Sequence, residues 1–162
     1  MPKIIICCDG SYNAVLRHGG GAAIFCEEYY PVKKSCLPNL LIFKENILSS
    51  CEMELEIALV ALSSLQKFQA TEILLIVDCL VVKEVVDQAS NEISDLKGIN
   101  FLSAKSYPLA LRLQEEVKRT KVEVMIANED YPTGNHHFSN LHKRVDVLAK
   151  EALHQKLNFS PF

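Results

Sequence analysis

Apolar residues gather in short dense runs that polar, turn-rich segments separate. These runs predict five strands, at residues 3–9, 21–30, 38–45, 72–78 and 121–127. The first three strands have short connections, at 10–20 and at a turn around Pro31 and Lys33-Lys34, which is typical of an antiparallel meander. The run at 72–78 is apolar throughout, as in a central parallel strand.

Four other segments change to helical periodicity. Residues 50–67 repeat leucines at helical spacing, and Ser49 or Ser50 can serve as the N-cap. Helices are also predicted at 80–89, at 107–119 with Pro108 in the first turn, and at 139–156. Residues 128–137 form a polar loop. The order of these elements predicts an α/β fold with a mixed five-stranded sheet flanked by helices.

The bulk properties fit one globular domain. A chain of 162 residues with 49% apolar residues can bury a sizeable core, so we expect a single domain over residues 1–162. The apolar runs are too short to span a bilayer and the N-terminus does not resemble a secretory signal, which favours a cytoplasmic protein. The six cysteines lack C-x-x-C spacing, so buried thiols are expected rather than a zinc site.

Four acidic residues lie next to or within predicted strands and helices, where a buried carboxylate would be energetically unfavourable without a partner. Asp9 and Asp78 end apolar runs, whereas Glu54 and Asp146 lie in predicted helices. Carboxylates at the ends of buried strands lose hydration unless a cation meets them, and hard divalent cations prefer oxygen ligands. Singly, each acid has an ordinary alternative: a turn or cap for the two aspartates at strand ends, a solvated helix position for Glu54, and an intrahelical lysine pair for Asp146.

The acids and the order of the elements resemble the type 1 ribonuclease H family over nearly the whole chain. The motifs that carry the resemblance are Asp9-Gly10-Ser11, the glycine run before residues 22–25, Met53-Glu54-Leu55, Asp78 after an apolar strand, and Arg144-Val145-Asp146-Val147-Leu148-Ala149. The resemblance implies a ribonuclease H-like fold and two Mg²⁺ ions per site, with Mn²⁺ as a substitute. Asp9 would bridge both ions, and Glu54, Asp78 and Asp146 would complete the site.

The implied activity is hydrolysis of the RNA strand of RNA–DNA hybrids, leaving a 5′-phosphate and a 3′-hydroxyl. His136 lies ten positions before Asp146, in the loop where the family keeps a catalytic histidine, and His137 could take that role instead. We expect a monomer that binds hybrid nucleic acid. The candidate substrate-binding residues are Ser11, Asn13 and Ser50. The histidines expected at the surface are His18, His142 and His154.

Some features depart from the family pattern. Amide residues usually precede the second carboxylate, but this chain has Ser49-Ser50-Cys51-Glu52 there, and Glu52 is expected to repel a phosphate. The chain has no tryptophan, its net charge is −3, and residues 87–120 mix acidic and basic side chains instead of forming a basic handle. Two alternatives therefore stay open: a catalytically weak or inactive binding module, or a nuclease of the same fold that acts on double-stranded RNA or another nucleic acid.

Overall fold

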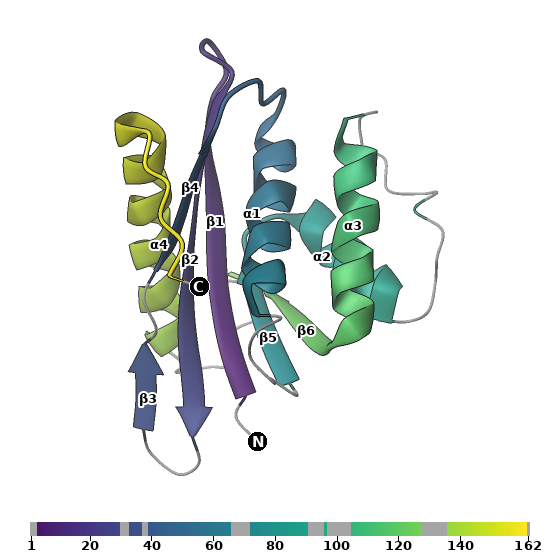
Figure 1. The fold of residues 1–162 in the computed structure, drawn as a ribbon. Helices are drawn as coiled ribbons and strands as arrows, with labels where there is room; N and C mark the ends of the chain where they lie inside the picture. Colours follow the sequence, from purple (N-terminus) through teal and green to yellow (C-terminus); the bar gives the residue numbers. More distant parts are fainter. Residues whose placement is uncertain are drawn as a thin grey trace.

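The computed structural model arranges the chain in three layers (Figure 1). It describes residues 3–29, 33–36, 39–65, 72–90, 96, 105–127 and 136–161, with side chains throughout except at 28, 29, 33–36, 90 and 136–139. A central sheet carries helix α4 on one face and helices α1, α2 and α3 on the other. This arrangement confirms the predicted α/β fold.

The sheet is mixed, as predicted. Its strands are β1 (Lys3–Asn13), β2 (His18–Tyr29), β3 (Lys33–Cys36), β4 (Leu40–Lys44), β5 (Glu72–Val77) and β6 (Lys121–Ile126). The order is β3-β2-β1-β5-β6, and β4 also pairs with β2. β2 is antiparallel to β1, β3 and β4, whereas β5 is parallel to β1 and β6. Because β3 and β4 pair with successive stretches of β2, at 26–29 and 19–23, together they fill one of five positions across the sheet.

Two predicted connections are instead strands. The predicted loop at 10–20 shrinks to residues 14–17, because β1 continues to Asn13 and β2 begins at His18. The glycines that suggested a loop are strand residues packed closely on both faces: a Cβ on Gly20 would lie 2.4 Å from the backbone nitrogen of Leu153 in α4, and a Cβ on Gly21 would lie 2.9 Å from the Ile57 Cβ in α1. The predicted turn at Lys33-Lys34 belongs to β3, where lysines are common on an edge strand.

The helices are α1 (Ser50–Ser64), α2 (Leu80–Ser90), α3 (Ser106–Arg119) and α4 (His136–Gln155). Ser49 is the N-cap of α1, and its hydroxyl accepts a hydrogen bond from the Glu52 nitrogen at 3.1 Å. α4 begins earlier than predicted, so His136 and His137 stand in its first turn and not in a loop. The remainder of the predicted loop, 128–135, lies outside the described residues. None of the described helices combines the length and apolar character needed to cross a membrane.

Alternation along β1 divides the core and orients the residues at its end. Ile4, Ile6 and Cys8 pack with the helices on the α1 side, whereas Ile5 and Cys7 pack with α4. Side chains on a strand point to opposite faces in turn, so the next odd position, Asp9, belongs to the α4 face and Gly10 to the α1 face.

The segment after α4 returns to the sheet along β4. Phe159 and Leu41 exchange backbone hydrogen bonds of 2.8 Å in both directions, and the Asn158 side-chain oxygen accepts from the Phe43 nitrogen at 2.9 Å. This short bridge satisfies backbone groups that an edge strand leaves open.

Candidate active site

Strand pairing brings Asp9 and Asp78 to the same end of the sheet. β1 and β5 run parallel, with Cys7 opposite Ile76, so two residues further on Asp9 approaches Asp78 just beyond the end of β5. Asp9 is 5% exposed, whereas the Asp78 side chain is 53% exposed. One carboxylate is therefore buried in the sheet, and its neighbour opens to solvent.

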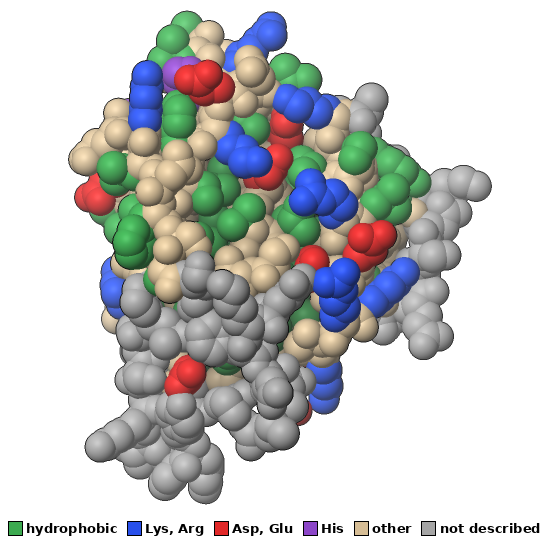
Figure 2. Space-filling model, viewed as in Figure 1, with side chains coloured by type: hydrophobic (Ala, Val, Ile, Leu, Met, Phe, Trp, Pro, Cys, Tyr) green, Lys and Arg blue, Asp and Glu red, His purple; other side chains and the backbone are tan. Residues whose placement is uncertain are grey.

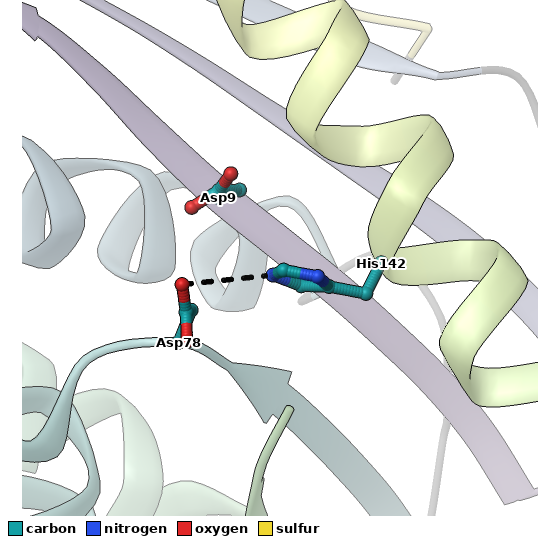
Figure 3. Close-up of side chains that lie close together, drawn as sticks. All are labelled: Asp9, Asp78 and His142. Carbon is teal, nitrogen blue, oxygen red and sulfur yellow. Dashed lines mark ion pairs between the residues drawn. The ribbon is translucent and has the colours of Figure 1, made fainter. Parts of the chain in front are cut away.

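Helix α4 adds a histidine to this pair. His142 Nε2 lies 3.9 Å from Asp78 Oδ2, and donor atoms of Asp9, Asp78 and His142 all lie within 4.8 Å of one another. Figure 3 shows the three side chains converging from β1, the end of β5 and α4. The expectation that His142 lies at the surface is wrong, since its side chain is only 14% exposed. Its spacing of four residues from Asp146, which places both on one helix face, is the signal that could have identified it.

Glu54 reaches the cluster from α1. Its Oε1 accepts a hydrogen bond of 3.1 Å from the Gly10 nitrogen, and its carboxyl group is hydrogen-bonded to Asp9. A Cβ on Gly10 would lie 3.3 Å from the Glu54 carboxyl carbon, so the missing side chain makes room for this approach. Glu54 Oε2 is buried, which excludes the alternative of a solvated helix glutamate.

Asp146 completes the cluster from α4. It forms the intrahelical pair that its sequence context allowed, with Lys150 Nζ at 3.0 Å from its Oδ2. The same side chain is hydrogen-bonded to Asp9. Asp9 therefore contacts both Glu54 and Asp146 and lies beside Asp78 and His142, at the centre of the cluster.

This crowding changes the ionisation of the acids. Burial raises the pKa of Asp9 to about 6, although its hydrogen bond with Glu54 acts to lower it. Burial, followed by the charge of Asp9, raises the pKa of Glu54 well above its ordinary value. Partial burial opposes the change at Asp146, but hydrogen bonds with Lys150 and Asp9 hold its pKa below the ordinary value. Asp9 and Glu54 therefore both hold protons more tightly than free carboxyl groups do.

The donor set suits a divalent cation. Glu54 Oε2 and His142 Nε2 are buried and have no hydrogen-bond partner within the part of the chain that the structure describes. Carboxylate oxygens are the usual ligands of Mg²⁺, and an added imidazole nitrogen is compatible with Mn²⁺. Asp9, Asp78 and His142 could thus hold a metal ion, with the unpartnered Glu54 oxygen directed to the same cluster.

The residues predicted to bind substrate differ in exposure and local role. Ser11 and Asn13 are half-buried near the end of β1, and the Asn13 side-chain oxygen accepts from the backbone nitrogens of Val15 and Leu16, each at 3.0 Å. Asn13 therefore shapes the β1–β2 turn. Ser50 is exposed as the first residue of α1.

The remaining histidines occupy separate places. His136 is the first residue of α4, and its side chain, like that of His137, lies outside the described residues. His154 is exposed, as predicted. His18 is half-buried and meets the Phe43 ring edge-on, with a centroid separation of 5.1 Å.

Glu52 differs from its predicted role. It is 1% exposed, its Oε2 accepts from the Leu48 nitrogen at 2.7 Å, and its Oε1 pairs with Lys105 Nζ at 3.1 Å. The expectation that Glu52 repels a phosphate is wrong, because its carboxylate faces inward and is neutralised by a lysine. Glu52 instead stabilises the N-terminal end of α1 through these contacts.

Comparison with known proteins finds structures with a similar fold but no similar sequence. No protein-family model and no curated protein matches this chain. RNase H1 from the halophilic archaeon Halobacterium salinarum superposes with a TM-score of 0.63 and 16% identity, covering 94% of this chain and 98% of that one. The N-terminal RNase H domain of rv2228c from Mycobacterium tuberculosis, solved as a fusion with maltose binding protein, gives 0.65 and 18%, covering 96% of each chain.

A third solved structure is a foamy viral protease-reverse transcriptase in complex with an RNA/DNA hybrid. It superposes with a TM-score of 0.62 and 11% identity, covering 95% of this chain and 20% of that much longer one. At these identities the likeness establishes a shared fold.

Proposed function

We propose that this chain, whose fold is ribonuclease H-like, is a metal-dependent endoribonuclease that cuts the RNA strand of RNA–DNA hybrids, leaving a 5′-phosphate and a 3′-hydroxyl. The observation that carries the proposal is the convergence of four acids from β1, α1, the end of β5 and α4 on one point. They are Asp9, Glu54, Asp78 and Asp146. The similar structures include RNase H proteins and a foamy viral protease-reverse transcriptase in complex with an RNA/DNA hybrid, which supports this choice of substrate.

In the proposed reaction, bound cations and protein side chains have separate roles. Two Mg²⁺ ions, or Mn²⁺ in their place, held by the four acids would activate the attacking water and stabilise the leaving oxygen. Asp9 is suited to a central role in holding the ions, because it contacts Glu54 and Asp146 and lies beside Asp78. His142, beside Asp78, is a candidate proton-transfer group. His136 is our candidate for a second proton-transfer group, at the start of α4.

The ionisation of the metal-free cluster supports this division. Asp9 and Glu54 both hold protons more tightly than usual because their charges are buried and adjacent. A divalent cation would favour their ionised forms, so metal binding should lower the pKa of both groups. The residues that repel one another without a cation are those that would bind it.

The surface offers a mixed rather than a uniformly basic approach to nucleic acid. Figure 2 shows lysine and arginine side chains interspersed with acidic ones over the face that α1 and α3 form. Lys44 pairs with Glu56 at 3.1 Å, and Lys105 pairs with Glu52. Hybrid recognition would depend on minor-groove shape and 2′-hydroxyl contacts, for which Ser11, Asn13 and Ser50 are our candidates.

Replacing Asp78 with asparagine tests the function directly. We expect the wild-type protein to cut a labelled hybrid in Mg²⁺ or Mn²⁺, and Asp78→Asn to cut it at least about 100-fold more slowly, because one anionic ligand is lost. Asp78 is half exposed, so the variant should fold. Asp87→Asn is the matched control, since Asp87 is a half-exposed acid of α2 that pairs with Lys83. A hybrid left intact by the wild type in both metals contradicts the proposal, and cutting confined to double-stranded RNA changes the substrate.

Metal-dependent stabilisation tests whether the cluster is a binding site. At neutral pH, saturating Mg²⁺ or Mn²⁺ should raise the melting temperature of the wild type by roughly 5–10 °C, because a ligand that binds only the folded state stabilises it. Glu54→Gln, which keeps the shape but lacks the charge, should reduce this shift. The measurement is thermal unfolding with metal against chelator. A wild type that gains nothing from either metal favours a binding module without catalysis.

A further inference from the structure

A buried carboxylate lies outside the acidic cluster. Glu52, in the first turn of α1, is 1% exposed and stands two residues before Glu54. The proposed chemistry makes no use of it. A carboxylate loses its hydration on burial, so it stays buried only where a cation and hydrogen-bond donors surround it. The groups that hold Glu52 therefore indicate its role.

Glu52 is held through both its side chain and its backbone. Its Oε2 accepts from the Leu48 nitrogen at 2.7 Å, and its own nitrogen donates to Ser49 Oγ at 3.1 Å. These reciprocal bonds are similar to a capping box and fix the path by which the chain enters α1. Its Oε1 forms an ion pair with Lys105 Nζ at 3.1 Å. Lys105 thus supplies the positive charge that the buried carboxylate requires.

Lys105 connects α1 to a separate helix. It is the N-cap residue of α3, one helical turn before Leu109, which packs in the core on the α1 side of the sheet. Its Nζ also donates a hydrogen bond to the backbone oxygen of Asn46. Asn46 has a φ of 59°, in the left-handed region, and marks a sharp bend in the segment between β4 and α1. The ammonium group therefore joins α3 both to this bend and to the first turn of α1.

The segment between β4 and α1 is also held by the first two strands. The Ile47 nitrogen donates to the Arg17 oxygen at 2.9 Å, and the Ile47 oxygen accepts from the Tyr12 hydroxyl at 3.0 Å. Removing the charge of Lys105 would release the segment from α3 and leave these contacts in place.

The first turn of α1 determines where Glu54 stands. Glu54 Oε1 accepts from the Gly10 nitrogen at 3.1 Å. A Cβ on Gly10 would lie 3.3 Å from the Glu54 nitrogen and 3.3 Å from the Met53 carbonyl carbon, so the helix backbone lies directly on β1 at this point. A shift of this turn therefore changes the separation between Glu54 and the neighbouring Asp9.

We propose that the Glu52–Lys105 ion pair positions Glu54, and that it thereby sets how tightly the acidic cluster binds a divalent cation. Lys105 acts through the backbone of α1, since its ammonium group contacts Glu52 and Asn46 rather than the cluster. Without that group the Glu52 carboxylate must turn toward water, which breaks its hydrogen bond with Leu48 and loosens the turn that carries Glu54. The effect on the cation rests on the proposed function, whereas the effect on the turn does not.

Amide hydrogen exchange of the full chain in chelator tests the positioning itself. Lys105→Met keeps an apolar stem but lacks the charge. We expect it to raise the exchange rate of the amides at 52–54 at least about tenfold, because the unpaired carboxylate favours local opening. The amides at 58–64, in the second half of α1, should exchange as in the wild type. Unchanged exchange at 52–54 overturns the proposal.

Two further variants separate the charge from the bulk of the side chain. Glu52→Gln/Lys105→Met leaves no unpaired charge and keeps an oxygen for the Leu48 nitrogen, so it should restore most of the protection at 52–54. Lys121→Met is the matched control, because Lys121 forms an exposed pair with Glu72 at the opposite end of β5 and β6. The same increase in exchange in the double variant or in the control contradicts the role of the ion pair.

Calorimetric titration with Mn²⁺ tests the consequence for the cluster. Lys105→Met should bind Mn²⁺ about tenfold more weakly than the wild type, in the range for loss of a group that supports a metal ligand. Lys105→Arg, which keeps the charge, should bind like the wild type. Unchanged Mn²⁺ affinity in Lys105→Met overturns the coupling to the cluster.

Hybrid cleavage distinguishes positioning from substrate contact. Lys105→Met should need about tenfold more Mn²⁺ for half of its maximal rate, in step with its weaker metal binding, while its KM for the hybrid at saturating Mn²⁺ stays unchanged. A raised KM with wild-type Mn²⁺ affinity would make Lys105 a substrate contact and overturn the proposal. A wild type that binds no Mn²⁺ contradicts the proposed function and the effect on the cation, while the exchange rates still decide whether the pair positions Glu54.

Discussion

Asp9→Asn should abolish hybrid cleavage and, at the same time, make the metal-free protein more stable at neutral pH. Asparagine has nearly the same shape but cannot supply the central negative charge, so we expect the rate to fall at least about 1000-fold, at the upper end for loss of one electrostatic group. The stability should rise because a buried, crowded carboxylate no longer has to ionise. A residue that only supports the fold would show the opposite change in stability.

The pH dependence makes this expectation specific. The pKa of Asp9 is raised from 3.8 to about 6, so the folded state binds the proton more tightly than the unfolded state. The stability from this group is complete below pH 4 and is lost as pH rises through about 6. A shift of this size corresponds to roughly 3 kcal/mol, and the raised pKa of Glu54 acts in the same direction.

Denaturant unfolding in chelator at acidic and neutral pH measures the effect. The wild type should lose stability across this interval, and Asp9→Asn should lose less. Asp87→Asn, a half-exposed acid away from the cluster, should keep the wild-type slope. If the Asp9→Asn protein is less stable than the wild type at neutral pH, then the buried carboxylates of the cluster do not destabilise the metal-free fold by repelling one another.

Gly20→Ala should destabilise the fold and separate α4 from the sheet. A Cβ at this position would lie 2.4 Å from the Leu153 nitrogen and 2.6 Å from the Ala149 oxygen, both backbone atoms that cannot move independently of α4. We expect a cost of about 3 kcal/mol, at the high end for overpacking, and a melting temperature lower by about 10 °C. The displaced helix carries Asp146 and His142 away from Asp9, so cleavage should fall as well.

The neighbouring glycine supplies the matched control. A Cβ on Gly19 would meet the Met53 sulfur at 2.3 Å, but this atom is near the end of a flexible side chain that can move away. Gly19→Ala should therefore cost about 1 kcal/mol, below the usual overpacking penalty, and largely retain activity. Equal losses in the two variants would show that close packing on either face of β2, and not contact with the α4 backbone in particular, sets the cost.

The parts of the fold that depend on periodicity were predictable. Continuous apolar strands and leucine-rich helices have strong local patterns, and the structure has strands over 72–77 and 121–126 and a helix from Ser50. The glycine run was not, because glycine usually marks a turn and only close packing, against α4 at Gly20 and against α1 at Gly19 and Gly21, explains it within β2. β3 escaped prediction because its two lysines resemble a turn.

The identities of the site residues were predictable where the resemblance to a known family pointed to them. Their burial and their partners, which depend on contacts between distant parts of the chain, were less predictable. The four acids do meet, with Asp9 at the centre as the resemblance implied, but their sequence contexts do not reveal how tightly each of them holds a proton. His142 was missed because a histidine in a polar helix is ordinarily solvated, and only the position of α4 over Asp9 buries it. Glu52 was misjudged because its partner, Lys105, comes from a distant part of the chain.

The contribution of α4 also determines when the site can exist. Asp146 and His142 come from a helix that follows every strand in the chain, and they meet Asp9 near its beginning. Contacts of such sequence separation form late, after much of the chain has ordered. A partly folded molecule therefore lacks the assembled acidic cluster and, under the proposed function, should be inert toward nucleic acid. Titration with metal would then measure the fraction of molecules in which the fold is complete.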